Sequence, residues 1–241
     1  MAVAINANKL IFMKNVILIF LLNLLVSTSL FAQTFVGLKA GGALSGNTSG
    51  GIGLGGSAFA KPTYLGGFFI SVPLTDNLRV QPEVLYVNKG NQSRIVPRRS
   101  FTPRYNLHYI NLPIILQYHV LNRLMVELGP EFGYLLSAGT NLNASGSIVS
   151  FSPPPEFPSF HEQLLSSFRD FDIAINLGMG YVLSDRWSLN LRYNLGLYDI
   201  SDDFEVSFRK IGDPNGEVES ILFSGTRYNR SAQISVGYRI F

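Results

Sequence analysis

Three features of the sequence predict an all-β fold, an eight-stranded antiparallel transmembrane β-barrel preceded by a cleaved signal peptide. Apolar residues recur at every second position through eight segments, an apolar run stands near the amino terminus, and short connections alternate with long ones. The composition agrees, because 46% of the residues are hydrophobic and only 15% are charged, against about 25% charged in an average soluble domain. A content of 12% aromatic residues with 23 glycines argues against a disordered chain and against a helical bundle.

The amino-terminal segment reads as an export signal. Lys14 precedes the apolar run from Val16 to Val26, and small and polar residues then lead to Ala32, after which we place the cleavage site. Residues 1–32 form the predicted signal peptide, with Met13 as an alternative start, and residues 33–241 form the predicted barrel domain. A transmembrane anchor is the other interpretation, but the run is shorter than the ~20 residues that a spanning helix needs.

Eight segments of the mature chain alternate between apolar and polar or glycine positions, which is the pattern of a strand with one apolar face. The first four segments are 36–40, 64–72, 78–86 and 110–118. The last four are 124–136, 171–183, 187–197 and 232–240. Three prolines fall inside these segments, where a closed barrel has no free edge, and we expect Pro82, Pro113 and Pro130 to occupy bulges or rim positions.

The connections between these segments alternate strictly in length. Short connections are expected at 73–77, 121–123 and 184–186, and long ones at 45–62, 88–106, 137–169 and 199–227. Short turns on one rim and long loops on the other are typical of outer-membrane barrels with both termini in the periplasm and the long loops outside the cell. A soluble lipocalin-like barrel, with its apolar face turned inward, has the same alternation along each strand and is the alternative.

Several segments resemble the PorT-like outer-membrane β-barrel family. The resemblance rests on Pro73 to Tyr86, Tyr109 to Pro113, Glu127 to Pro130 and Leu191 to Gly196. It spans nearly the whole mature chain, and it implies an integral protein of the cell outer membrane, in some members tied to protein secretion.

No arrangement of residues in the sequence indicates an enzyme. His108, His119 and His161 are scattered, and no spacing forces them to converge with an acid or a serine, so we expect no catalysis, no cofactor and no metal. The absence of cysteine excludes disulfides and thiol chemistry, and a net charge of +3 is too small to indicate a nucleic-acid partner. We therefore expect a structural or interaction protein with a plugged lumen, with a small porin-like channel and, less favoured, an outer-membrane enzyme as alternatives.

The long connections suggest partners at the cell surface. The connection at 88–106 is basic, and its Arg94, Arg98, Arg99 and Arg104 could hold lipopolysaccharide phosphates, since guanidinium groups match them bidentately. Other envelope or secretion proteins are the further partners that we expect. Residues 159–162 fit a capping box, which predicts a short helix over 163–168 that covers the barrel mouth.

Alternating residues at 203–209 and 217–223 flank a turn sequence, so we expect the last two barrel strands to continue as a hairpin beyond the membrane.

The polar positions of the strands predict a charged lumen. In an eight-stranded barrel the third strand lies opposite the seventh and the first opposite the fifth, which places Glu83 against Arg192 and Lys39 against Glu127. We expect these four residues to form a salt-bridge layer across the lumen, since an unpaired charge there is costly. The full predicted inward set is balanced and comprises Lys39, Arg79, Arg192, Arg239, Glu83, Glu127, Glu131 and Asp172.

Overall fold

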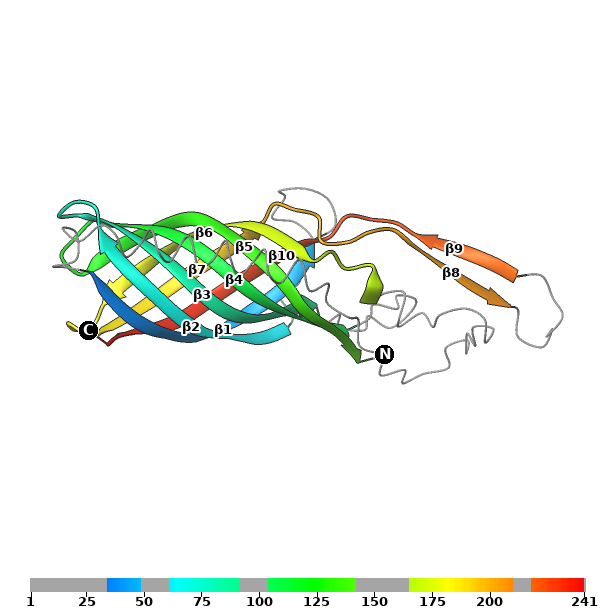
Figure 1. Cartoon of the computed structure of the whole chain (residues 1–241), viewed down its shortest axis with the longest axis horizontal. Helices are drawn as coiled ribbons and strands as arrows, with labels where there is room; N and C mark the ends of the chain where they lie inside the picture. Colours follow the sequence, from blue (N-terminus) through cyan, green and yellow to red (C-terminus); the bar gives the residue numbers. More distant parts are fainter. Residues whose placement is uncertain (1–33, 49–60, 92–103, 142–164, 210–217, 241) are drawn as a thin grey trace, which may run out of the picture. The chain divides into compact units, whose positions relative to one another are not determined.

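A computed structural model describes residues 34–48, 61–91, 104–141, 165–209 and 218–240. Eight of its strands close into a barrel (Figure 1). They are β1 (Phe35–Thr48), β2 (Lys61–Pro73), β3 (Leu78–Asn91), β4 (Arg104–His119), β5 (Leu124–Asn141), β6 (Phe171–Val182), β7 (Trp187–Gly196) and β10 (Tyr228–Arg239). The predicted signal peptide lies outside the described residues.

The barrel strands are all antiparallel to their neighbours, in the order β1-β10-β7-β6-β5-β4-β3-β2. The first and last strands close the ring, with Gly37 opposite Arg239 and Thr48 opposite Tyr228. The prediction of an eight-stranded antiparallel barrel is confirmed. This order places β3 diametrically opposite β7, and β1 opposite β5.

The two faces of the wall follow the alternation seen in the sequence. The outer face is apolar and exposed, as at Phe68, Leu128 and Leu191, whereas the intervening residues point into the lumen and are buried. Buried lumenal residues are mostly polar or charged, which is the reverse of a soluble barrel with an apolar interior. None of the helices in the described part of the chain is long and apolar enough to cross a membrane.

The two ends of the barrel differ. We call the end that carries the connections 74–77, 120–123 and 183–186 the short-turn rim, and the opposite end the long-loop rim. Backbone hydrogen bonds close the short turns, such as that from the amide of Leu183 to the carbonyl of Trp187 (2.9 Å). At the long-loop rim β1 to β5 run further than the sequence predicts. Arg104, expected in a loop, is the first residue of β4 and pairs with Asn141.

The prediction that the three prolines occupy bulges or rim positions was wrong. Pro82, Pro113 and Pro130 lie within strands, and the register is the same on both sides of each of them. The pairing ladder instead skips two residue pairs beside each proline, always toward the preceding strand. A missing amide hydrogen is thus accommodated by a local gap in the ladder, without an extra residue.

A separate two-stranded sheet is inserted between β7 and β10. It consists of β8 (Phe204–Arg209) and β9 (Val218–Phe223), with Phe204 opposite Phe223. The two strands pair as expected, but they do not continue the barrel strands. The carboxylate of Asp199 accepts hydrogen bonds from the amides of Ser201 (3.1 Å) and Arg227 (2.8 Å), and the amide of Ile200 donates to the carbonyl of Arg227 (2.9 Å).

Glycine is required in β5 where the strands approach closely. A Cβ on Gly129 would meet the carbonyl oxygen of Ile114 and come within 2.9 Å of the Cα of Ile115, whereas a Cβ on Gly139 of the same strand would meet nothing within 4 Å. We expect Gly129→Ala to lower the free energy of unfolding by about 1–3 kcal/mol through overpacking.

The matched control is Gly139→Ala, which should be neutral or stabilising by less than about 1 kcal/mol. Urea unfolding of the barrel in lipid vesicles, followed by the fluorescence of Trp187, the single tryptophan, measures both variants. Equal stability of the two variants would contradict this account of Gly129.

Candidate functional site

The centre of the lumen holds a group of paired charges that we call the Glu83 layer, formed by Lys39, Glu83, Glu127 and Arg192. Arg192 on β7 reaches across the barrel to Glu83 on β3. Its Nη1 lies 2.9 Å from Oε2 of Glu83 and its Nη2 lies 2.7 Å from Oε1. This bidentate geometry is the strongest arrangement of a guanidinium and a carboxylate.

The same guanidinium also binds a second carboxylate. Nε of Arg192 lies 2.5 Å from Oε2 of Glu127, so one arginine links two glutamates on different strands. Lys39 completes the layer through its Nζ, 2.5 Å from Oε1 of Glu83. The sequence paired Lys39 with Glu127, but the structure pairs it with Glu83, because β3 lies only two strands from β1, within reach of the lysine side chain, whereas β5 lies on the opposite wall.

Neutral amides satisfy the remaining carboxylate oxygens of the Glu83 layer. Gln81 donates to Glu83 (2.7 Å), and Gln117 and Asn190 donate to Glu127 (2.8 Å each). All four charged side chains are buried, at 1–4% exposure. The charges balance within the layer, which offsets the desolvation cost of placing them in a narrow lumen.

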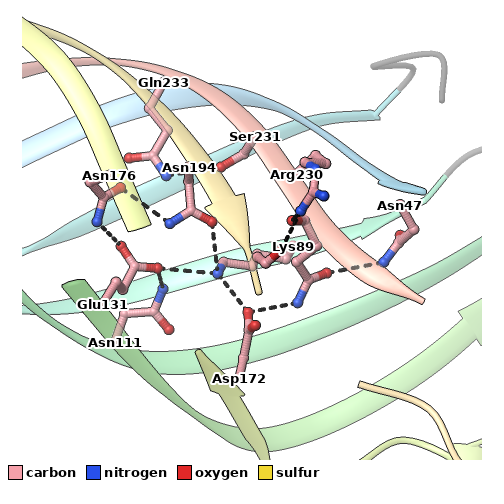
Figure 2. A network of polar contacts seen from close by, with 12 residues as sticks. Asn47, Lys89, Asn111, Glu131, Asp172, Asn176, Asn194, Arg230, Ser231 and Gln233 are labelled. Carbon is pink, nitrogen blue, oxygen red and sulfur yellow. Dashed lines mark hydrogen bonds and ion pairs between the residues drawn. The ribbon is translucent and has the colours of Figure 1, made fainter. Parts of the chain in front are cut away.

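A second group lies toward the long-loop rim and is shown in Figure 2. We call it the Lys89 layer, after the lysine at its centre. Nζ of Lys89 lies 2.9 Å from Oδ2 of Asp172 on β6 and 3.2 Å from Oε1 of Glu131 on β5. Lys89 lies on β3, so these ion pairs again cross the interior of the barrel.

Asparagines complete the Lys89 layer (Figure 2). Asn176 donates to Glu131 (2.9 Å), Asn229 donates to Asp172 (2.8 Å), and Asn111 also donates to Glu131. Asn194 accepts from Lys89 (3.4 Å) and donates to Asn176 (3.1 Å), which joins the bonds into one network.

Above the Lys89 layer the lumen contains a buried apolar cluster beside buried polar side chains such as Lys61, which donates to the carbonyl of Tyr105 (3.3 Å). Tyr105, Leu107, Tyr109, Phe168 and Ile200 form a buried cluster that we call the Phe168 cap. The rings of Tyr105 and Phe168 lie 4.9 Å apart, and Phe168 bridges to Ser201. The segment that was predicted to cover the barrel mouth contributes Phe168 to this cap. Of the predicted helix, residues 165 and 166 are helical, and residues 159–164 lie outside the described residues.

The remaining predicted site residues do not form a site. Arg94, Arg98 and Arg99 of the basic loop lie outside the described residues, as does His161, so the lipopolysaccharide hypothesis stays a prediction. His108 faces outward and stacks on Tyr86 at 5.8 Å between ring centres. Among the described residues, no group of three or more His, Asp or Glu is placed to hold a metal ion.

Sequence reasoning missed Lys89. It was assigned to a loop, although it continues the inward parity of Arg79, Gln81 and Glu83 by three further steps of two residues. Following this parity past Tyr86 would have placed it in the lumen.

Comparison with known families identifies the barrel. The family described as outer membrane protein beta-barrel domain matches residues 31–202. The chain belongs to this family. It is an eight-stranded β-barrel of the outer membrane. No curated protein matches the chain.

Three solved structures are similar to this outer-membrane barrel. Neisserial surface protein A is 14% identical, with 85% of this chain and 97% of that one covered and a TM-score of 0.47. OprG from Pseudomonas aeruginosa is 14% identical, with 86% and 95% covered and a TM-score of 0.44. Ail of Yersinia pestis, in complex with the heparin analogue sucrose octasulfate, is 9% identical, with 86% and 99% covered and a TM-score of 0.42.

The Glu83 layer makes a specific prediction about stability. Glu83→Ala and Arg192→Ala should each destabilise the barrel by about 3–5 kcal/mol, because each leaves a buried charge without its partner. The double substitution should lose less than the sum of the two single losses, since the residues share one interaction.

Denaturant unfolding in lipid vesicles measures this cycle. The control is Glu205→Ala, an exposed carboxylate in β8, which should change stability by no more than about 0.5 kcal/mol. Additive losses in the double variant would show that the two charges do not stabilise each other.

Proposed function

We propose that this protein is an outer-membrane barrel with a closed lumen, which acts as an anchor for interactions at the cell surface. The observation that carries the proposal is the stacking of the Glu83 layer, the Lys89 layer and the Phe168 cap along one lumen. Eight strands leave an interior that side chains can fill, and here the filling groups are bonded to one another from opposite walls. Hydrated ions would have to break these pairs to pass.

The wall of the barrel suits the anchoring role. Its apolar outer face stabilises the protein in lipid, while the paired interior supplies rigidity without an aqueous path. Activity then resides at the two ends. We propose that both termini and the short turns face the periplasm and that the long-loop rim, with β8 and β9, faces outward, in accord with the architecture of outer-membrane barrels.

The partners of the protein follow from this orientation and from the family resemblance. We propose outer-membrane lipid and lipopolysaccharide around the barrel and other envelope proteins, including components of protein secretion, at the exposed end. The β8 and β9 hairpin presents exposed positions such as Leu222, which is 64% exposed. We propose no catalytic role, since the two described histidines, His108 and His119, lie on different faces of the wall.

The closed lumen can be tested in planar bilayers. We expect the purified barrel to insert without producing conductance steps above the lipid baseline. The control is a porin of known conductance that is added afterwards to the same bilayer. Reproducible steps from the barrel alone would favour the small-channel alternative and contradict the closed lumen.

Orientation can be tested by labelling, because the protein has no native cysteine. A membrane-impermeant maleimide should label Ser220→Cys in β9 on intact cells. Asn122→Cys in a short turn should react only after the outer membrane is permeabilised. Both positions are exposed in the structure, so access alone decides the result. The opposite labelling pattern would reverse the proposed orientation.

A further inference from the structure

The short-turn rim encloses a cavity that the closed lumen does not explain. Its volume is about 180 Å³, and it ends below the Glu83 layer. Its wall combines apolar and basic groups. The apolar members are Phe35, Phe69, Met125 and Trp187, and the cationic members are Arg79, Arg186 and Arg239. This mixture of apolar surface with a few convergent polar groups is typical of a small-molecule site.

Two guanidinium groups line this cavity, and that of Arg79 already donates to the hydroxyl of Ser71 (2.8 Å) and to its carbonyl (3.2 Å). The Cζ atom of Arg239 lies 3.5 Å from the ring centre of Phe35, and that of Arg79 lies 4.6 Å from the same centre. The two cations therefore lie within about 8 Å of each other. Like charges at such a separation repel, and an anion between them would turn this repulsion into attraction.

Arg239 forms no close ion pair within the described part of the chain, although the carboxylate of Asp185 attracts it from a longer distance. No described carboxylate lies within 4.0 Å of its guanidinium nitrogens, although Asp76 and Asp185 belong to the rim of the cavity. Its guanidinium group lies over the face of the Phe35 ring. The five hydrogens of its guanidinium match the geometry of a carboxylate.

The imidazole of His119 on the wall of the cavity adds to this arrangement. Nδ1 of His119 is buried and has no hydrogen-bond partner among the described residues. Phe69 forms the apolar floor, with its ring 6.1 Å from that of Phe35 and 5.8 Å from Nζ of Lys39. Gln81 and Gln117, which donate to Glu83 and Glu127, also line the cavity, so it ends at the Glu83 layer, whose own charges are already paired.

We propose that this cavity binds a small organic carboxylate, with the carboxylate on the guanidinium of Arg239, in the positive field that Arg79 reinforces, and the apolar body against Phe69 and Met125. The volume is below the about 300–1,000 Å³ of pockets for drug-sized ligands, so the bound part is small. Such a carboxylate belongs either to a free acid or to the carboxyl end of a peptide that approaches from the short-turn side. The proposed site requires only residues of the short-turn rim. It does not depend on whether the lumen is closed or on the orientation of the barrel in the membrane.

The single tryptophan, Trp187, lines the cavity and supplies a local signal. The experiment titrates the full barrel, refolded in a zwitterionic detergent, with 4-nitrobenzoate, whose nitroaromatic ring quenches tryptophan fluorescence. The neutral 4-nitrobenzamide measures quenching that does not depend on the carboxylate. We expect saturable quenching by the acid, with an affinity at least tenfold above that of the amide.

Arg239→Gln should weaken binding of the acid at least tenfold, and Arg239→Lys should weaken it less. Arg123→Gln, which removes a cation from a neighbouring short turn outside the cavity, should leave the affinity unchanged. Unheated gel mobility shows that each variant is folded. Equal quenching by acid and amide, or an unchanged affinity in Arg239→Gln, would overturn the proposal.

A second pair of probes distinguishes the two sources of the carboxylate. A short peptide that ends in 4-nitrophenylalanine is compared with its carboxyl-terminal amide. Tighter binding of the acidic peptide than of 4-nitrobenzoate identifies a peptide end as the ligand. Binding of the free acid alone identifies a small metabolite-sized acid, because the peptide backbone is then excluded by the short turns.

Discussion

Arg192 places its guanidinium in a lumen that eight strands leave barely wide enough for side chains, and its burial constrains everything around it. The charge is far from water, so it needs carboxylates on several sides, and Glu83 and Glu127 supply them. Two glutamates beside one arginine would leave an excess negative charge, which Lys39 balances. The side chains of four strands are thus fixed by one electrostatic requirement.

The Lys89 layer meets the same requirement by other means. One lysine faces two carboxylates, and asparagine amides donate the remaining hydrogen bonds. Amides can do this without adding charge, which explains why lumenal positions of β6, β7 and β10 carry asparagine. The two layers together bond opposite walls at two heights, whereas the wall ladder alone connects only adjacent strands.

The sequence predicted the parts of this arrangement that depend on alternation. A strand period of two separates inward from outward residues, and ring closure then places Glu83 opposite Arg192. Lys89 escaped prediction because residues 88–91 of β3 are polar or glycine, so the apolar stripe that marks the strand ends before it, and only the parity of the earlier residues indicates its direction. The choice of Glu83 as the partner of Lys39 also escaped, because it depends on side-chain reach across two strands. The gaps in the ladder beside Pro82, Pro113 and Pro130 also escaped prediction, because the sequence does not show which neighbouring strand the nitrogen of each proline faces.

The paired layers also determine where activity can reside. A ligand at the short-turn rim would meet Phe69, and beyond it a layer whose charged members are all paired with one another. Transmission to the long-loop rim would require an element with two arrangements of similar energy, and spatial continuity does not supply one. The barrel therefore separates its ends instead of connecting them. The proposed binding of a carboxylate at one rim and the proposed recognition of a partner at the other are therefore independent of each other.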